Sequence, residues 1–354
     1  MIEKLKNSIR NSEYDAALIA SPENRFYFTG FESSDGYLII SKDEAVFITD
    51  GRYIEAAQIK AKGCKVVLQE KKASQIKDIL VSLGAKSVAV EADRMTLSEY
   101  TLFASALEGI EIIADGSLDS EINSLRSVKT PEEVEKIKTA QAIAEKAFEH
   151  ILGFIKAGRT EKEIALELDY YMLSHGAQGI SFETIAVSGA KSSMPHGVPD
   201  EKPIENGDFL TMDFGAVYEG YHSDMTRTVA VGNASDEMKE VYYTVLKAQE
   251  SSIAAIRAGL SCKDADAAAR SVIENAGCGE YFTHSTGHGV GVEIHEFPNL
   301  SHISDKTLKI GNIVTVEPGI YIPKKFGVRI EDMVLVCENG CENLTKAPKE
   351  LIIL

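Results

Sequence analysis

Short apolar runs alternate with helical periodicity over the first 125 residues. Apolar, β-forming runs occur at residues 16–20, 36–40, 45–49, 64–68 and 87–90, and helical periodicity occurs near 74–83 and 97–107. Such alternation indicates an α/β domain. The region has no phosphate loop, no dinucleotide-binding glycine motif and no histidine. We therefore do not expect it to catalyse a reaction alone.

Two polar clusters interrupt this first pattern. The aromatic segment 24–31 is predicted as a strand that leads into the polar loop 32–35, and residues 49–53 are predicted as a turn that enters a helix. The simpler interpretation is structural. The alternative is that these loops border a substrate site, across a dimer interface if one exists.

The pattern changes near residue 127. Thr130, Pro131 and Glu133 form a capping box with proline at the first helical position, which predicts a long helix over 131–155. A second box at 160–163 starts another helix that ends near 175. A strand at 182–187 and helices at 236–258 and 263–276 follow. We divide the chain into domains 1–125 and 126–354.

Two acid-bearing segments of the second domain resemble each other. Residues 207–215 and 311–319 match at the first glycine, at a threonine and at the closing glycine, and Asp213 corresponds to Glu317. Each segment continues to a second acid, Asp224 or Glu331. We interpret this as an internal duplication that brings four carboxylates to one centre. Exposed strand residues are the alternative for any single acid.

Four buried carboxylates require cations, because like charges at close range drive some of them to protonate. Two divalent metal ions would balance about four negative charges and would activate a water molecule. The sequence therefore predicts a dinuclear metal site, and amide hydrolysis as its reaction.

Histidines supply the remaining groups of the predicted site. His288 lies between glycines and is the expected nitrogen ligand. His196, His284 and His295 are candidates for donating to an oxyanion, although each is also compatible with a surface or capping role. His222 is interpreted as a neighbour of Asp224, and the other histidines, His150, His175 and His302, as structural.

Composition excludes several classes of protein. The 354-residue chain has a net charge of −17, which disfavours binding to nucleic acid and to anionic membranes. No apolar run approaches the roughly 20 residues of a membrane span. The five cysteines are scattered, and Cys337 and Cys341 flank a predicted turn. This usage favours a soluble protein of the reducing cytoplasm.

These motifs together resemble a known family. The segment 27–31, the helix start at 131–133, the Pro195–Gly197 segment and the acid and histidine motifs are similar to those of metal-dependent proline peptidases of the pita-bread fold. This group includes prolidase (Xaa-Pro dipeptidase) and aminopeptidase P. The resemblance implies a creatinase-type α/β amino-terminal domain, an α+β pita-bread catalytic domain with internal duplication, and cleavage of the bond before proline.

The resemblance also implies roles for individual residues. Asp213 would bind one metal ion, His288 and Glu317 the other, and Asp224 and Glu331 would bridge the two. Glu317 would be the general base, and substrate or transition-state contacts would come from His196, His284, His295, Tyr321 and Arg329. The family implies manganese, with cobalt, zinc or iron as alternatives, and a homodimer.

Two competing functions stay open from the sequence. A creatinase-like hydrolase would work without metal, and a non-catalytic pita-bread protein would bind a ligand only. Both are expected to lack part of the ligand set, which is complete here. Dipeptidase and aminopeptidase activity are not separated by these motifs, although the compact length favours prolidase.

Overall fold

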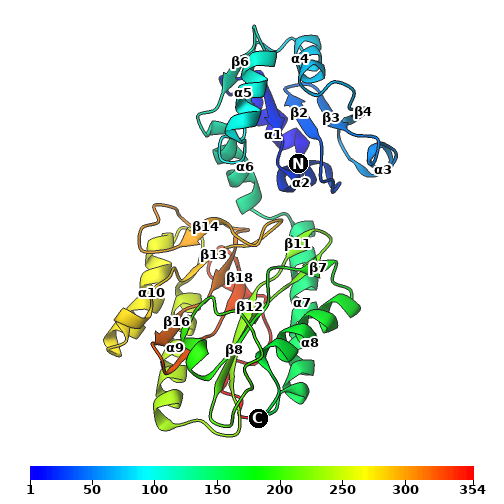
Figure 1. Ribbon diagram of the computed structural model, residues 1–354. Helices are drawn as coiled ribbons and strands as arrows, with labels where there is room; N and C mark the ends of the chain where they lie inside the picture. The colour runs from blue at the N-terminus through cyan, green and yellow to red at the C-terminus, as the bar shows by residue number, and fades with distance from the viewer. The chain divides into compact units, whose positions relative to one another are not determined.

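The computed structural model describes residues 1–354, which divide into two compact units. The first comprises Met1–Arg126 and the second Ser127–Leu354. Figure 1 colours the chain from the first unit, in blue and cyan, to the second, in green to red. No helix of the chain is both long enough and apolar enough to cross a membrane.

The first unit is built on one six-stranded sheet. Its spatial order is β4-β3-β2-β1-β5-β6, with antiparallel pairing of β1, β2 and β3 and parallel pairing elsewhere. The strands are β1 (Ala16–Ile19), β2 (Tyr37–Ser41), β3 (Ala45–Thr49), β4 (Lys65–Leu68), β5 (Ser87–Val90) and β6 (Glu111–Ile113).

Helices cover this sheet and complete the α/β unit (Figure 1). One core joins Leu18 and Ile39 of the sheet to Leu80 and Phe103 of two helices. The helices are α1 (Ile2–Ile9), α2 (Pro22–Thr29), α3 (Ile54–Lys60), α4 (Lys72–Ser82), α5 (Leu97–Ala106) and α6 (Ser117–Ser127).

The strand predicted for residues 24–31 is wrong, because most of this segment forms helix α2. Pro22 occupies the first turn, where its missing N–H costs nothing, and Gly30 ends the helix in the left-handed region with a φ of 68°. These two end signals outweigh the β propensity of the aromatic residues. The helix also buries Arg25, which donates to the carbonyl oxygens of Ser33 and Gly36.

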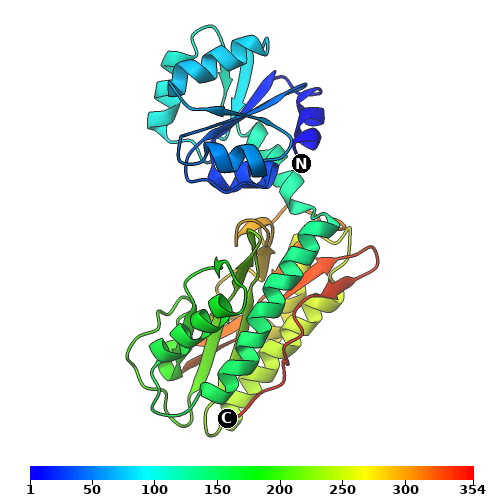
Figure 2. The same ribbon diagram turned by 90° about the vertical axis from the view of Figure 1, so that its right-hand side faces the viewer.

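Two helix pairs flank the sheets of the second unit. In Figure 1, α7 and α8 lie on one side of the strands and α9 and α10 on the other. Figure 2 shows α7 running the length of this unit. Thr130 and Glu133 form the predicted capping box. The bounds are α7 (Pro131–Phe154), α8 (Glu161–Ser174), α9 (Asp236–Ala255) and α10 (Cys262–Asn275).

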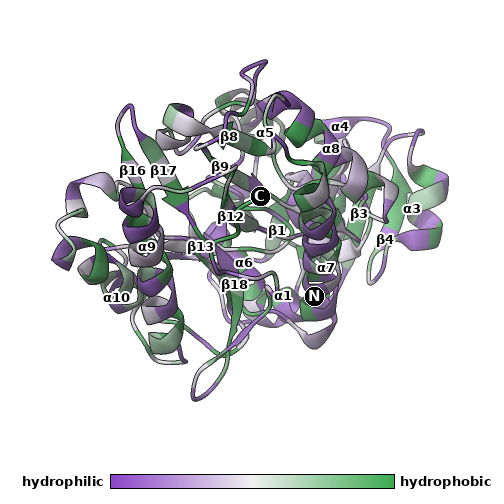
Figure 3. Ribbon diagram, turned by 90° about the horizontal axis from the view of Figure 1, so that it is seen from below, coloured by the Kyte–Doolittle hydropathy of each residue, from purple (hydrophilic) through white to green (hydrophobic).

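The helices of this unit are amphipathic. Hydrophilic and hydrophobic residues alternate along α7 and α9 (Figure 3). Phe148 and Ile151 of α7 pack with Leu210 and Met212 in one core, whereas Tyr242 of α9 belongs to a second. Each helix pair therefore has its own core against the strands.

The strands of the second unit repeat one arrangement twice. In the first half, β9 (Phe209–Phe214) pairs with β12 (Met225–Ala230) and β8 (Ile185–Ser188), and the hairpin of β10 (Ala216–Tyr218) and β11 (Tyr221–His222) lies between β9 and β12 in sequence. In the second half, β15 (Ile313–Val316) pairs with β18 (Asp332–Val336) and β13 (Gly287–Gly289). The hairpin of β16 (Gly319–Ile322) and β17 (Phe326–Arg329) lies between β15 and β18 in sequence and corresponds to the β10–β11 hairpin. A helix pair precedes each half, so the duplication extends to whole elements.

The remaining elements are short. Strand β7 adds to the β10–β11 hairpin, and β14 and β19 are the edges of the five-stranded sheet. Two 3₁₀ turns precede β9 and β13 in sequence. The bounds are β7 (Gly179–Ile180), η1 (Gly189–Ser193), η2 (Gly279–Tyr281), β14 (Glu296–Leu300) and β19 (Cys341–Asn343).

Candidate metal centre

The acids of both halves lie where the paired strands end. Asp213 is on β9 and Glu317 directly follows β15, whereas Asp224 and Glu331 directly precede β12 and β18. Asp213, Asp224 and Glu331 are buried, and Glu317 keeps a side-chain exposure of 17%. The duplicated strand pairs therefore direct four carboxylates towards one region.

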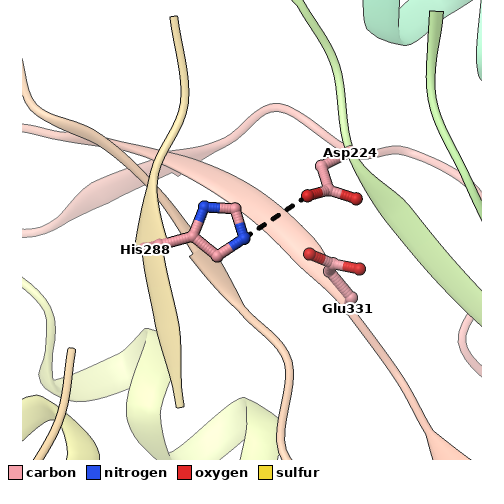
Figure 4. A group of neighbouring side chains, drawn as sticks. All are labelled: Asp224, His288 and Glu331. Atoms are coloured by element: carbon pink, nitrogen blue, oxygen red, sulfur yellow. Dashed lines mark ion pairs between the residues drawn. The ribbon is translucent and has the colours of Figure 1, made fainter. Parts of the chain in front are cut away.

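One histidine joins these acids. Asp224, His288 and Glu331 each offer a ligand atom, and the three atoms lie within 4.8 Å of one another. The side chains converge from three places in the fold: His288 lies on β13, and Asp224 and Glu331 lie just before β12 and β18 (Figure 4). The Nε2 atom of His288 is 3.5 Å from Asp224 Oδ2 and 3.4 Å from Glu317 Oε1.

Glycines make this convergence possible. A Cβ atom on Gly287 would lie 1.9 Å from the carbonyl oxygen of Thr315, so only glycine lets β13 approach β15 this closely. This close approach lets the Thr315 hydroxyl accept a hydrogen bond from the His288 amide at 3.0 Å. The same hydroxyl donates to Glu317 Oε1 at 3.1 Å. This threonine thus aligns one histidine with one carboxylate.

Burial and mutual repulsion set the protonation of the acids. Burial, followed by the charges of nearby acids, raises the pKa values of Asp224 and Glu331 well above the usual range. Burial also raises the pKa of Glu317 to about 8, against the opposing effect of Arg329. Burial lowers the pKa of His288, which keeps the imidazole neutral. Without a cation, burial and mutual repulsion therefore favour the protonated forms of these three acids.

The donor set fits a divalent metal ion. Asp213 Oδ1 and Glu331 Oε1 are buried and have no hydrogen-bond partner in the protein. Buried carboxylate oxygens without donors are costly unless a cation meets them. Carboxylate oxygens with a neutral imidazole are ligands typical of divalent ions, and a bound ion would replace the protons.

Arg329 links the acids to the rest of the site. Its guanidinium donates to Asp213 Oδ2 at 2.6 Å and to the hydroxyl of Tyr321 at 2.7 Å. Burial lowers the pKa of Arg329, but Tyr321 and Asp213 raise it by more, so that it lies well above the usual value. Arg329 is therefore a fixed cation beside the acids.

His284 continues this chain of hydrogen bonds. Its Nδ1 lies 2.8 Å from the carbonyl oxygen of Ser285, which can only accept, so Nδ1 carries the proton. Its Nε2 lies 3.0 Å from the Tyr321 hydroxyl and accepts from it. Burial, with a further effect of Arg329, lowers the pKa of His284 to about 4. Both ring nitrogens are engaged, and the ring is neutral.

A cavity of about 660 Å³ opens onto the acids. Its lining includes Asp213, Asp224 and Glu317, together with His196, His284 and His295. His196 and His295 are exposed within it, and the His295 ring lies 4.4 Å from that of His288. This volume suits a small peptide. The structure thus brings the candidate site residues of the sequence analysis to one region, although Tyr321 and Glu331 are not part of the cavity lining.

Several partners of the site were not singled out in the sequence. Thr226 donates to Glu331 Oε2 at 2.7 Å, and Thr315 bridges His288 and Glu317. The sequence did contain a signal for the role of Thr315, because Thr211 and Thr315 occupy matching positions in the duplicated segments. Lys129 and Glu296 form a buried ion pair of 2.9 Å, and Asp266 and Arg270 of α10 form an ion pair of 2.8 Å that holds the loop before β13. The first pair carries no sequence signature, and the second shows only the four-residue spacing of an ordinary helical ion pair.

Comparison with known families identifies this architecture. The model of metallopeptidase family M24 matches residues 135–338, and that of the creatinase/prolidase N-terminal domain matches residues 1–128. The chain belongs to metallopeptidase family M24. The family identification and the fold class expected from the motifs are confirmed.

Individual proteins of this family match along their whole length. The solved structure of an Xaa-Pro dipeptidase from Bacillus anthracis is 45% identical, covers 100% of this chain and 99% of that chain, and has a TM-score of 0.96. An Xaa-Pro dipeptidase from Pyrococcus furiosus is 40% identical, over 99% of both chains. The structure of an X-Pro aminopeptidase from Thermotoga maritima is 40% identical, covers 98% of this chain and 100% of that chain, and has a TM-score of 0.91.

Proposed function

We propose that this metallopeptidase is an Xaa-Pro dipeptidase that works with two divalent metal ions. The protein is a metal-dependent peptidase of the Xaa-Pro group, and the dipeptide preference and the two ions are the specific proposals. The observation that supports the two ions is the convergence of four carboxylates and His288 beside one cavity. Relatives named as dipeptidases match over the whole chain, as does one named as an aminopeptidase.

Five residues would hold the ions. Asp213 would bind one ion, and His288 and Glu317 the other. Asp224 and Glu331 would bridge them. The unpartnered oxygens of Asp213 and Glu331 support this assignment. When bound, divalent ions supply Lewis-acid activation of the substrate carbonyl and of water.

Glu317 is proposed to move the proton of the reaction. Water adds to the carbonyl carbon of the residue before proline, Glu317 takes a proton from the water, and it passes a proton to the proline nitrogen as the C–N bond breaks. Its residual exposure to the cavity allows this transfer. Thr315, at 3.1 Å from Oε1, would hold the carboxylate in place.

The cavity histidines would bind the substrate. His196 and His295 are exposed in the lining and can donate to the developing oxyanion or to the carboxylate of proline. Arg329 also lines the cavity, so it would both hold Asp213 in position and contact the substrate. A dedicated site is useful because the bond to proline lacks an N–H and restricts the backbone.

The test compares two substrates with and without metal. Hydrolysis of alanyl-proline and of alanyl-prolyl-alanine is measured with manganese present and again after chelation. Metal-dependent cleavage of the dipeptide alone is the expected result. Cleavage of the tripeptide at the bond before proline would instead show an aminopeptidase.

The same assay separates a metal-independent hydrolase from a non-catalytic protein. Activity that survives chelation would favour a creatinase-like hydrolase. No cleavage of either peptide by folded, metal-loaded protein would favour a non-catalytic binding protein. Alanyl-alanine is the control for general dipeptidase activity, and equal cleavage of it would contradict the proline specificity.

Three finer properties are also proposed. The oxygen-rich ligand set favours manganese, with cobalt, zinc or iron as alternatives, and metal analysis of the purified protein tests this. The five cysteines are all free, which supports a reducing cytoplasm. We further propose a homodimer, which light scattering after gel filtration would test.

A further inference from the structure

Helix α10 carries a partly buried ion pair that lies outside the cavity lining. Asp266 and Arg270 are four residues apart, and two guanidinium nitrogens of Arg270 lie 2.8 and 2.9 Å from the two oxygens of Asp266. The side chain of Asp266 is 1% exposed and that of Arg270 19%. Such a two-point pair is geometrically restrictive, because the guanidinium and the carboxylate must be coplanar.

Both members of the pair also hold the loop that precedes β13. Arg270 donates to the carbonyl oxygens of Phe282 at 3.1 Å and of His284 at 2.9 Å, and its guanidinium lies 4.2 Å from the Phe282 ring centroid. Asp266 Oδ1 accepts from the amide of Thr286 at 3.2 Å and from its hydroxyl at 2.8 Å. The pair therefore holds the loop at three alternate residues.

This loop contacts the candidate metal centre by two routes. The side chain of His284 accepts from Tyr321, whose oxygen accepts from Arg329, which in turn donates to Asp213. The carbonyl oxygen of Thr286 accepts from the backbone N–H of Glu317 at 2.8 Å. One route ends at a ligand of the first half and the other at a ligand of the second.

We propose that Asp266 and Arg270 are positioning residues that set the place of His284 and Glu317 in the peptidase site. This inference rests on the proposed function. Neither residue lines the cavity, so neither touches the substrate. A displacement of about 1 Å at a reacting group lowers catalysis by about a hundredfold, which makes a rigid support valuable.

The main test is Arg270→Lys. Lysine keeps the charge but cannot reach Asp266, Phe282 and His284 together. We expect kcat for an Xaa-Pro peptide to fall about 10- to 100-fold, with the KM within about threefold and the metal content unchanged. Arg270→Ala is the second variant, and guanidinium ion at millimolar concentration should restore part of its kcat by occupying the vacated position.

The chain provides a closely matched control in Arg159. This arginine on the approach to α8 also pairs with an acid four residues away, Glu163, at 3.1 Å. It also donates to a phenylalanine carbonyl, that of Phe154, at 3.0 Å and lies 3.6 Å from that ring centroid. Arg159→Lys should lower stability comparably and leave kcat unchanged. A similar kcat for the two lysine variants would overturn the proposal.

A second readout does not depend on activity. The ring nitrogens of His284 should show a single tautomer in the NMR spectrum, with Nδ1 protonated, and Arg270→Lys should convert this signal into a mixture of tautomers. An unchanged signal would overturn positioning of His284 by Arg270. Wild-type protein that binds metal and cleaves no Xaa-Pro peptide would contradict the proposed function instead, and this NMR comparison would still decide the positioning.

Discussion

Arg329 donates to Asp213 across the duplication, with 2.6 Å between guanidinium nitrogen and carboxylate oxygen. Asp213 belongs to β9 of the first half, whereas Arg329 ends β17 of the second. A cation supplied by one half therefore holds a candidate metal ligand of the other half. Both side chains are buried, so the contact is shielded from solvent and is strongly directional.

Replacing Arg329 should misplace Asp213. Arg329→Lys retains the charge but cannot contact Asp213, Tyr321 and Thr226 at once. We expect kcat/KM or metal affinity to fall by about 10- to 100-fold, measured by peptide hydrolysis and by metal titration. Arg52→Lys, in an exposed ion pair with Asp50, is the control and should change neither. Unchanged kinetics in Arg329→Lys would show that Asp213 needs no such support.

Replacing Glu317 should stop turnover while the protein stays folded. Glu317→Gln is isosteric but loses both an anionic ligand and the proposed proton acceptor. We expect kcat to fall by at least about a thousandfold, and the circular dichroism spectrum to be retained. Glu135→Gln on the surface of α7 is the control. Substantial activity of Glu317→Gln in a preparation with measured metal content would remove Glu317 from the mechanism.

Removing metal should destabilise the catalytic unit. The acids of the site are buried close together in the folded protein, so a metal ion would bind the folded state and not the unfolded chain. A ligand that binds only the folded state stabilises it by about 2.7 kcal/mol at a hundredfold excess over its Kd. Chelation should therefore lower Tm, and manganese should restore it in proportion to the logarithm of its concentration. Calorimetry measures both. A Tm that is insensitive to chelator and to added metal would contradict a bound ion.

The low pKa of His284 should appear as a pH dependence of stability. The folded-state pKa of about 4 lies below the unfolded value near 6.5, so the unfolded chain binds this proton more tightly. The stabilisation is complete above about pH 6.5 and is lost as the pH falls towards 4. Between pH 7.5 and 5, wild type should lose about 1–2 kcal/mol more than His284→Gln. Urea unfolding at the two pH values measures the difference, and parallel losses would show that His284 titrates normally.

Closely packed glycines should resist substitution. In Gly287→Ala the new methyl group would meet the Thr315 carbonyl, so β13 must move away from β15 and carry His288 with it. We expect a stability loss of about 2–4 kcal/mol and weaker metal binding. Gly153→Ala in α7 meets nothing within 4 Å and should instead stabilise the protein by up to about 1 kcal/mol. Thermal unfolding of both variants is the measurement, and a harmless Gly287→Ala would show that β13 has room to shift.

Local signals account for the parts of the fold that were predicted from sequence. The box of Thr130 and Glu133 with Pro131 fixes the start of α7 through two hydrogen bonds that depend only on neighbouring residues. The acids were identified because charges in apolar strands at duplicated positions are unusual. The structure brings these acids together with His288, and their individual roles remain predictions.

The parts that were missed depend on contacts distant in sequence or on competing signals. Segment 24–31 has strand-forming aromatics, but its end signals and the burial of Arg25 favour a helix. Asp266 and Arg270 look like an ordinary helical ion pair, and only the folded loop at 282–286 reveals what they hold. Their role depends on hydrogen bonds to residues 12 to 20 positions away in the chain, which the periodicity of hydrophobic residues cannot predict.

The duplicated strand arrangement has a consequence for how such a centre arises. A half-length chain with one acid-bearing unit would assemble four carboxylates only by pairing with a copy of itself, and the present chain corresponds to that pair joined into one polypeptide. Joining frees the halves to diverge. Strand β13 carries His288, whereas its counterpart β8 reads Ile185-Ala186-Val187-Ser188 and has no imidazole. A symmetric ancestor would thus have two equivalent half-sites, and the fused chain has two that differ.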